Sequence, residues 1–482
     1  MKNRTFLMLL VISTLISFTA FADYPIFSQR YTADPSGIEY NGRLYLYCSG
    51  DFLGKNDDGT PNPGYHMKNI TCISTDDMKN WTDHGEVFDI KDSKWGARLT
   101  WAPTVVHRNN KFYLYYGNGD RSIGVAVSDS PAGPFVDTNN GPLVDNNTPG
   151  VFMGKNNANV HGALSGSENW GMWCFDPGVL VDDDGQAYMY FGGAHPDNAR
   201  VIKLKDNMTE IDGAAVKVNT PGFFEALFIN KYKGKYYLSY AGHNFSFPAN
   251  IEYVVSDKPM EGFANPGLIL ANPPANDENN NHHSIIQFKG EWYIAYHNRQ
   301  VAINNNVTNR KHREYMRSVA IDRLYHNPDG TIKQVIPTVD GVPQLQYLDP
   351  YKRTSAATMA RSHSVNTEPD GSGGRYLNEI KDGSWIAIKG VDFGMRGAKN
   401  FTAKVSSGGK GGKIEVRLAS PNGLLIGTVE VENTGSGQNW VEKTCNISNA
   451  VGIRDLYLVF RGQGDNLFTL SSWQFEVNTN NK

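Results

Sequence analysis

The chain has 482 residues, of which 20% are charged and 40% are hydrophobic, and its formal net charge is −3. This length suggests two or three domains, and the composition excludes a wholly disordered, collagen-like or coiled-coil chain. Lys and Arg form no basic block, which argues against a nucleic-acid binder, because neutralising phosphates needs clustered cations. The 49 Gly, 24 Tyr, 23 Phe and 9 Trp residues favour many short strands and turns, and so predict an all-β protein.

The N-terminus has the three parts of a secretory signal. Lys2 and Arg4 precede a short apolar run that ends in Ala20, Phe21 and Ala22, which predicts cleavage after Ala22. A transmembrane anchor is the alternative, but the run is short and is diluted by Ser and Thr. No later segment is apolar enough to span a membrane. We therefore expect a protein secreted to the periplasm or the medium.

One pattern recurs five times along the chain: a few apolar residues, a polar turn and an aromatic-rich strand. The copies cover residues 37–47, 105–116, 179–191, 227–240 and 285–296. Each copy is predicted to be a hairpin, since a polar turn separates two apolar strands, and a further strand follows each. Five such sheets predict a five-bladed β-propeller. A large sandwich is the alternative, but sandwiches do not repeat a hairpin five times.

After Pro350 the repeat stops. Residues 355–375, rich in Ser, Thr, Gly and Arg, are either a linker or an irregular first strand. Short alternating strands with Gly-rich turns then predict a β-sandwich of the jelly-roll kind. We therefore predict a signal peptide at 1–22, a catalytic propeller at 23–348 and a sandwich at 349–482.

The four cysteines, Cys48, Cys72, Cys174 and Cys445, match no zinc pattern. Cys48 and Cys72 lie in neighbouring predicted strands, so a disulfide between them and isolated buried thiols are both compatible with the sequence.

The start of each repeat carries the residues most suited to chemistry. In a propeller the innermost strands begin near the central axis, so the residues just before them converge. Aligning the copies places the following residues there: Asp34, Ala102, Asp176, Glu225 and His282. Glu225 lies in an apolar segment, which should raise its pKa. A protonated acid that faces an ionised one is what glycosidic cleavage requires.

These residues resemble glycoside hydrolase family 43, the five-bladed propeller arabinofuranosidases and xylosidases, over roughly residues 28–345. The resemblance is carried by RYTADP at 30–35, WAP at 101–103, IGVAVS at 123–128, GPF at 133–135, FDP at 175–177, Glu225 and HHSI at 282–285. It implies an inverting mechanism in which Asp34 is the general base and Glu225 is the general acid. It also implies that Asp176 orients the acid and tunes its pKa.

Further site residues are expected around this triad. Trp101, next to the axis, either forms an apolar wall against the sugar or packs between blades. Arg317 follows the fifth hairpin and either reaches the substrate or forms a surface salt bridge. Family members often hold a calcium ion beside an axial histidine, and both His282 and His283 are candidates for that position. No nucleotide, flavin or haem motif is present, so no organic cofactor is expected.

The second domain resembles the carbohydrate-binding module family 6 sandwich, through residues 390–394, 412–418, 425–428, 455–460 and 473–475. The stacking aromatics of that family fall at Glu379 and at residues 434–438, where no aromatic stands, although a slipped alignment would bring in Trp440. A typical sugar-binding Asn falls at Thr469. Since stacking supplies much of the binding energy, we expect a mainly structural or substrate-shaping domain.

Taken as a whole, the sequence predicts an exo-acting, inverting glycosidase that removes α-L-arabinofuranosyl groups from a plant cell-wall polysaccharide, arabinoxylan or arabinan. A β-xylosidase or xylanase-type activity on xylan is the alternative within this class. A non-catalytic sugar-binding propeller is the alternative of another class, but it would require the loss of one of the three acids. Residues 51–66 and 149–171 are the longest insertions and are expected to wall the funnel mouth.

Overall fold

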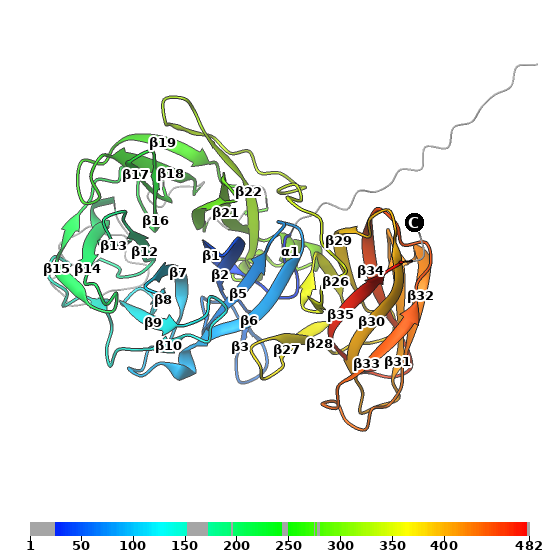
Figure 1. Ribbon diagram of the computed structural model, residues 1–482. Coiled ribbons are helices and arrows are strands. Elements are labelled where there is room, and N and C mark those ends of the chain that lie inside the picture. The colour runs from blue at the N-terminus through cyan, green and yellow to red at the C-terminus, as the bar shows by residue number, and fades with distance from the viewer. Residues whose placement is uncertain are drawn as a thin grey trace, which may run out of the picture.

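The computed structural model describes residues 25–151, 172–193, 196–242, 249–273, 275–276 and 280–479. These residues form a ring of sheets around a central axis, with a β-sandwich beside it, as Figure 1 shows. The fold class predicted from the sequence is therefore confirmed. The predicted signal peptide lies outside the described residues. Within the described ranges, no helix has the length and the apolar character needed to cross a membrane.

Five antiparallel sheets make the blades of the propeller. The first blade contains β1 (Ala33–Tyr40), β2 (Arg43–Ser49), β5 (Asn69–Thr75) and β6 (Trp81–Asp89). The second contains β7 (Trp101–Arg108), β8 (Lys111–Gly117) and β9 (Ser122–Ser128), with β10 (Val136–Asp137) and β11 (Val144–Asp145) both paired to β9. The third contains β12 (Gly178–Val181), β13 (Ala187–Phe191), β14 (Arg200–Leu204) and β15 (Ile211–Lys217). The fourth contains β16 (Glu225–Tyr232), β17 (Lys235–Ala241), β18 (Ile251–Ser256) and β19 (Ala264–Leu270), and the fifth contains β20 (His283–Phe288), β21 (Glu291–Asn298), β22 (Ser318–His326) and β23 (Ile332–Lys333).

Hydrophobic clusters between successive blades hold the ring together. The innermost strands follow one another around the axis as β1, β7, β12, β16 and β20, and β20 contacts β1. Each of five clusters is drawn mainly from two neighbouring blades. The recurring aromatic residues supply them: Tyr115 of blade two, for example, packs in one cluster with Met189 of blade three. Fully burying such a side chain contributes about 1.5–3 kcal/mol, so the repeat that defines the blades also holds them together.

A backbone irregularity opens the innermost strand of four blades. Asp34, Ala102, Asp176 and Ala226 all have positive φ, at 51°, 45°, 50° and 62°, and the strand register shifts at this point in β1, β7 and β16. This is a β-bulge, which re-aims side chains. The structural equivalent of Asp34 in blade four is thus Ala226, and our alignment of Glu225 with Asp34 is wrong by one residue. No Pro marks the bulge in blade four, so the sequence carried no sign of the offset.

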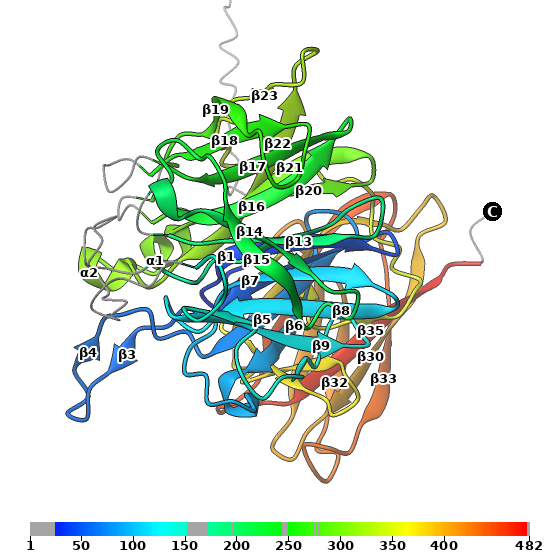
Figure 2. The ribbon, with the colours of Figure 1, turned by 90° about the vertical axis from the view of Figure 1, so that its left-hand side faces the viewer.

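One end of the propeller carries additional elements. The 51–66 insertion forms the hairpin of β3 (Gly54–Lys55) and β4 (Pro61–Asn62), and α1 (Gln300–Asn304) and α2 (Arg310–Arg313) connect β21 to β22. Figure 2 shows this hairpin and both helices projecting from the same side of the propeller. The second insertion that was expected to wall the funnel mouth is residues 149–171, of which 152–171 lie outside the described residues. Two 3-10 turns complete the helical segments of the described chain, Ile90–Asp92 and Pro196–Asn198.

Two sheets form the sandwich. One runs β27 (Asn366–Pro369), β28 (Arg375–Asn378), β35 (Thr469–Val477), β30 (Ala398–Ser406) and β33 (Val441–Asn446), with β24 (Thr354–Ser355) paired to β35. The other runs β26 (Arg361–His363), β29 (Trp385–Asp392), β34 (Ile453–Arg461), β31 (Gly412–Leu418) and β32 (Leu424–Val431). Their inner faces enclose one core, which includes Phe401 and Trp473.

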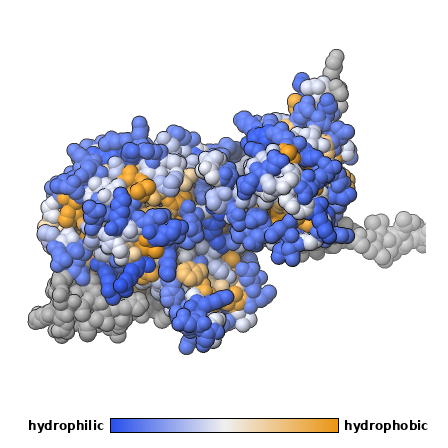
Figure 3. Space-filling model, turned by 90° about the horizontal axis from the view of Figure 1, so that it is seen from below, coloured by the Kyte–Doolittle hydropathy of each residue, from blue (hydrophilic) through white to orange (hydrophobic). Residues whose placement is uncertain are grey.

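On the face of the molecule in Figure 3, hydrophobic residues lie in small separate groups among hydrophilic ones.

The sandwich is joined to blade one by backbone pairing and buried polar contacts. Strand β25 (Thr358–Met359) pairs with β6 and extends the blade-one sheet. The buried carboxylate of Asp83 accepts hydrogen bonds from Arg30 and from Thr367 of the sandwich. Because buried charges are costly unless they are paired, this contact fixes the sandwich against the propeller.

The four cysteines are free thiols in this structure. Cys48 packs in the cluster between blades five and one, whereas Cys72 packs in the cluster between blades one and two. The two side chains therefore lie on opposite faces of blade one. Of the two alternatives left open by the sequence, the structure has the isolated thiols.

Candidate active site

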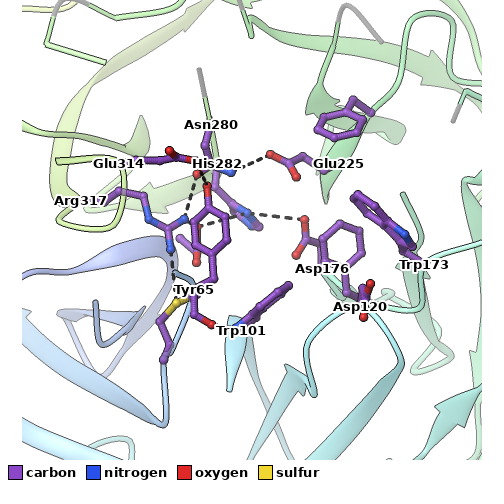
Figure 4. Close-up of a pocket in the computed structure, with 14 residues that line it drawn as sticks. Tyr65, Trp101, Asp120, Trp173, Asp176, Glu225, Asn280, His282, Glu314 and Arg317 are labelled. Atoms are coloured by element: carbon purple, nitrogen blue, oxygen red, sulfur yellow. Dashed lines mark hydrogen bonds and ion pairs between the residues drawn. The ribbon is translucent and has the colours of Figure 1, made fainter. Parts of the chain in front are cut away.

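A pocket of about 220 Å³ lies where the innermost strands begin, at the axis of the propeller. Figure 4 shows its walls. Six of the seven site residues predicted from the sequence line it: Asp34, Trp101, Asp176, Glu225, His282 and Arg317. His283 is the exception. The convergence expected from the repeat is therefore present, despite the one-residue offset at Glu225, because both residues of the bulge lie at the start of the innermost strand.

Asp34 is held as an ionised carboxylate. Arg317 Nη1 donates to its Oδ1 at 2.6 Å, and Ser49 Oγ donates to its Oδ2 at 2.8 Å. Burial opposes ionisation, but the Arg317 guanidinium and the contact with His297 outweigh it, so the pKa of Asp34 falls below its usual range. The backbone N–H of Asp34 donates to His297 Nδ1 at 3.2 Å. These contacts fix both the charge and the position of the carboxylate.

Arg317 is buried, with 2% of its side chain exposed. Its Nε and Nη2 donate to the two carboxylate oxygens of Asp51, each at 2.8 Å, and its Nη1 also donates to Asn280 Oδ1 at 2.9 Å. The surface salt bridge considered from the sequence is thus wrong. Arg317 lines the pocket, and its side-chain donors are engaged by Asp51, Asp34 and Asn280.

We expect Asp51→Asn to destabilise the protein. The substitution removes a buried negative charge and leaves Arg317 with one carboxylate instead of two, and breaking a buried pair costs about 3–5 kcal/mol. The free energy of unfolding, measured with urea, tests this. Glu210→Gln is the matched control, because Glu210 pairs with Lys205 on the surface, where ion pairs contribute little. Equal unfolding curves for the two variants would contradict a supporting role for Asp51.

Glu225 and Asp176 occupy the opposite wall, and the pKa of each carboxyl group is raised. Glu225 is 8% exposed and accepts a hydrogen bond from Asn280 Nδ2 at 2.8 Å. Burial and the charge of Asp34 raise the pKa of Glu225 to about 8. Burial, Glu225 and Asp34 also raise the pKa of Asp176, whose Oδ2 accepts the backbone N–H of Ala226 at 2.8 Å. The pocket therefore sets one ionised carboxylate, Asp34, against Glu225, which keeps its proton up to about pH 8, and against a second carboxyl group whose pKa is raised.

The two adjacent histidines have different environments. His282 Nδ1 lies 3.7 Å from Asp34 Oδ1 and 3.9 Å from Asp176 Oδ2, and burial lowers the pKa of His282 to about 4. His283 Nε2 lies 2.6 Å from Ser239 Oγ, and the ring packs edge-on against Phe228. His282 thus faces the axis, and His283 belongs to the blade.

The donors around His282 do not build a calcium site by themselves. Calcium prefers six to eight oxygen ligands, whereas this imidazole offers one nitrogen. Within the described ranges, no group of three or more His, Cys, Asp or Glu side chains is placed to hold a metal ion.

Aromatic side chains form the apolar part of the wall. Trp101 Nε1–H donates to the carbonyl oxygen of Tyr65 at 3.2 Å, and the two rings meet edge-on with centroids 5.8 Å apart. Trp173 packs edge-on against Phe175 at 5.4 Å, and Trp101 packs against this pair. Trp101 thus has features of both alternatives given for it from the sequence, because it packs with other aromatic side chains and also lines the pocket. Sugar rings bind such faces through their C–H groups.

Several residues that line or support the pocket were not predicted from the sequence. Trp173 and Phe175 closely precede Asp176 in the chain, and Tyr65 lies in the insertion expected at the funnel mouth, so their positions gave a signal. Asn280 and His297 gave none. Asn280 bonds to both Glu225 and Arg317, and its carbonyl oxygen lies 2.9 Å from His297 Nε2. It therefore links the acid wall of the pocket to the base wall.

An ionised carboxylate that faces a protonated one across a pocket is the arrangement that glycoside hydrolases use to cleave a glycosidic bond. The comparisons with known proteins agree with this class. The chain belongs to the glycosyl hydrolases family 43, whose family model matches residues 22–332. Residues 355–477 match the carbohydrate binding module (family 6).

Individual relatives cover most of the chain. It is 40% identical to an arabinoxylan arabinofuranohydrolase of Paenibacillus polymyxa, over 94% of this chain and 74% of the relative. A crystal structure of a family 43 arabinoxylan arabinofuranohydrolase from Bacillus subtilis, in complex with cellotetraose, matches with a TM-score of 0.85 and 36% identity, over 95% of this chain and 98% of that one. A family 43 β-xylosidase/α-arabinofuranosidase from a compost metagenome, solved with xylotriose in a calcium-free form, matches with a TM-score of 0.51 and 30% identity, over 65% of this chain and 97% of that one.

Proposed function

We propose that this glycoside hydrolase removes terminal α-L-arabinofuranosyl groups from arabinoxylan with inversion of configuration. The observation that carries the proposal is the pairing of ionised Asp34 with protonated Glu225 across one small axial pocket. The relatives that match over nearly the whole chain are named for this activity. The pocket volume of about 220 Å³ lies below the 300–1,000 Å³ of drug-sized sites, which suits a single sugar ring and thus an exo-acting enzyme.

In this mechanism Asp34 accepts a proton from a water molecule, whose oxygen attacks the anomeric carbon. The bond from that carbon to the departing oxygen breaks, and Glu225 donates its proton to this oxygen. Asp176 binds the backbone of Ala226, directly after Glu225, and so positions the acid. Arg317 and Asp51 keep Asp34 ionised and in place.

Sugar release by residues 23–482 from arabinoxylan tests the proposal, with Glu225→Gln as control. Free arabinose that disappears in the control supports it. Xylose alone would reassign the enzyme to the β-xylosidases with the same catalytic residues. Release of neither sugar would direct the search to arabinan and galactofuranose-bearing glycans, and binding without any cleavage would favour the non-catalytic propeller.

We expect kcat/KM on arabinoxylan to fall as the pH rises through about 8. The raised pKa of Glu225 keeps the proton on the acid below that pH and releases it above, so the donor is lost on the alkaline side. A pH profile measured with arabinoxylan tests this. A glycoside with an acidic phenol as leaving group is the control, because its departure needs no proton and the alkaline limb should be absent. An equal fall in kcat/KM above about pH 8 on both substrates would contradict the assignment of Glu225 as the general acid.

For the sandwich, we propose a role mainly in structure and substrate shaping. Trp440 packs edge-on against Tyr376, with ring centroids 5.4 Å apart, so this pair is the aromatic candidate for a sugar-binding cleft. Trp440→Ala should leave retardation of the full chain in xylan gels unchanged. Strong retardation that the substitution abolishes would instead assign such a cleft to this domain.

We propose that the protein is secreted. N-terminal sequencing of the exported protein should begin at Asp23 if the signal is cut after Ala22.

We also propose a calcium ion beside His282. This ion would draw most of its oxygen ligands from water, and the melting temperature should rise when calcium is added to chelator-treated protein. An unchanged melting temperature would speak against it.

A further inference from the structure

A second hollow adjoins the active-site pocket. It has a volume of about 500 Å³ and shares Tyr65, Trp101 and Asp120 with the pocket. Figure 4 shows Trp101 between Tyr65 and Asp120. Since these three residues line both spaces, they form the wall between them. Because the two spaces share this wall, the hollow gives the chain that bears a side group bound in the pocket room to extend beside it.

Two arginines line this second hollow, which we call the adjoining groove. Arg98 comes from the loop before β7, and Arg121 from the loop between β8 and β9; both are exposed. Asn118 Oδ1 accepts the backbone N–H groups of Arg98 and Leu99, at 2.8 and 3.3 Å, and so ties the first loop to the second. The carboxyl group of Asp120, by contrast, belongs to a residue that is only 8% exposed.

The two guanidinium groups are available to a ligand. Across the part of the chain that the structure describes, neither the Arg98 nor the Arg121 side chain forms a hydrogen bond or an ion pair. Both cations stand beside this pocket although the formal charge of the chain is −3. A guanidinium presents a planar fork of donors that matches a carboxylate.

We propose that this groove recognises a carboxylate on the polysaccharide, namely a uronic acid carried near the arabinofuranosyl branch. The inference rests on the proposed function for the orientation of the substrate, and it narrows the substrate class to acidic arabinoxylan. A neutral chain fits the same pocket, but it leaves Arg98 and Arg121 without a partner. The carboxylate therefore sets preference among substrates rather than the chemistry.

The test is binding by the full chain that carries Glu225→Gln, which should hold the polysaccharide without cleaving it. Two ligands are compared: arabinoxylan with its uronic acids, and the same preparation after reduction of its carboxyl groups to primary alcohols. We expect about tenfold tighter binding of the acidic form, because one exposed ion pair contributes little but two such pairs in the upper part of the usual range together give a factor of about ten. The difference should shrink at high salt, because the arginines are exposed.

Adding Arg98→Gln and Arg121→Gln should bring the affinity ratio of the two ligands close to one. Arg454→Gln, which removes an exposed arginine of the sandwich, is the matched control and should keep the tenfold ratio. Equal binding of both ligands before the arginines are changed, or a ratio that persists afterwards, would overturn the proposal. If the wild-type chain releases no arabinose but the carboxylate preference is present, then the proposed activity fails while the groove assignment stands.

Discussion

Glu225→Gln should lower kcat/KM on arabinoxylan about 10³-fold, while hydrolysis of a glycoside with an acidic phenol leaving group should be nearly unaffected. General acid catalysis contributes roughly 10²–10⁴-fold, and a sugar alkoxide is a poor leaving group that needs its proton. Glutamine keeps the size of the side chain but has no proton of the required acidity to give. The measurement is the ratio of kcat/KM on the two substrates, for the wild type and the variant.

Glu314→Gln is the matched control for this experiment. Glu314 also lines the pocket, and it accepts a hydrogen bond from the Tyr65 hydroxyl at 3.4 Å. Figure 4 shows it on the Arg317 side of the pocket, across from Glu225. Its substitution should affect both substrates by the same factor. If Glu225→Gln likewise lowered activity on both substrates equally, then Glu225 would act in binding and not as the acid.

Asp34→Asn should reduce kcat/KM by about 10³-fold or more on both substrates, whatever the leaving group, because the attacking water needs a base in either case. Asparagine preserves the contact with Ser49 but removes the charge that faces Arg317. Circular dichroism shows whether the fold survives. A loss confined to arabinoxylan would contradict the assignment of Asp34 as the base.

Two further measurements separate the base from a structural residue. In Asp34→Ala, added azide has room to attack the anomeric carbon in place of water, and the product should be a glycosyl azide of inverted configuration. The charge of Asp34 also helps to raise the pKa of Glu225, so its removal should lower that pKa and move the alkaline limb of the residual activity to lower pH. An unmoved limb would mean that burial alone protonates Glu225.

The propeller could be predicted because its signals are local. Each blade contains a hairpin in which two strands with apolar residues at every second position flank a polar turn. The whole pattern lies within about a dozen consecutive residues, so it can be recognised without knowledge of distant contacts. The same locality revealed Asp34 and Asp176, since each precedes a Pro at the start of a repeat. The one-residue offset of Glu225 could not be predicted from the sequence. A β-bulge inserts one extra residue into a strand, and in blade four no characteristic residue type marks the insertion.

By itself, then, the sequence determined the five-bladed propeller, the appended sandwich and the three carboxyl groups at the axis. Only the tertiary structure decided which groups set their charges. Arg317, Asp51 and Asn280 come from opposite ends of the propeller sequence and meet because blade five closes against blade one. It also decided that His282 and not His283 faces the axis, and that Arg317 is buried. These outcomes depend on side-chain direction and distance between segments far apart in the chain, and a one-dimensional pattern carries neither.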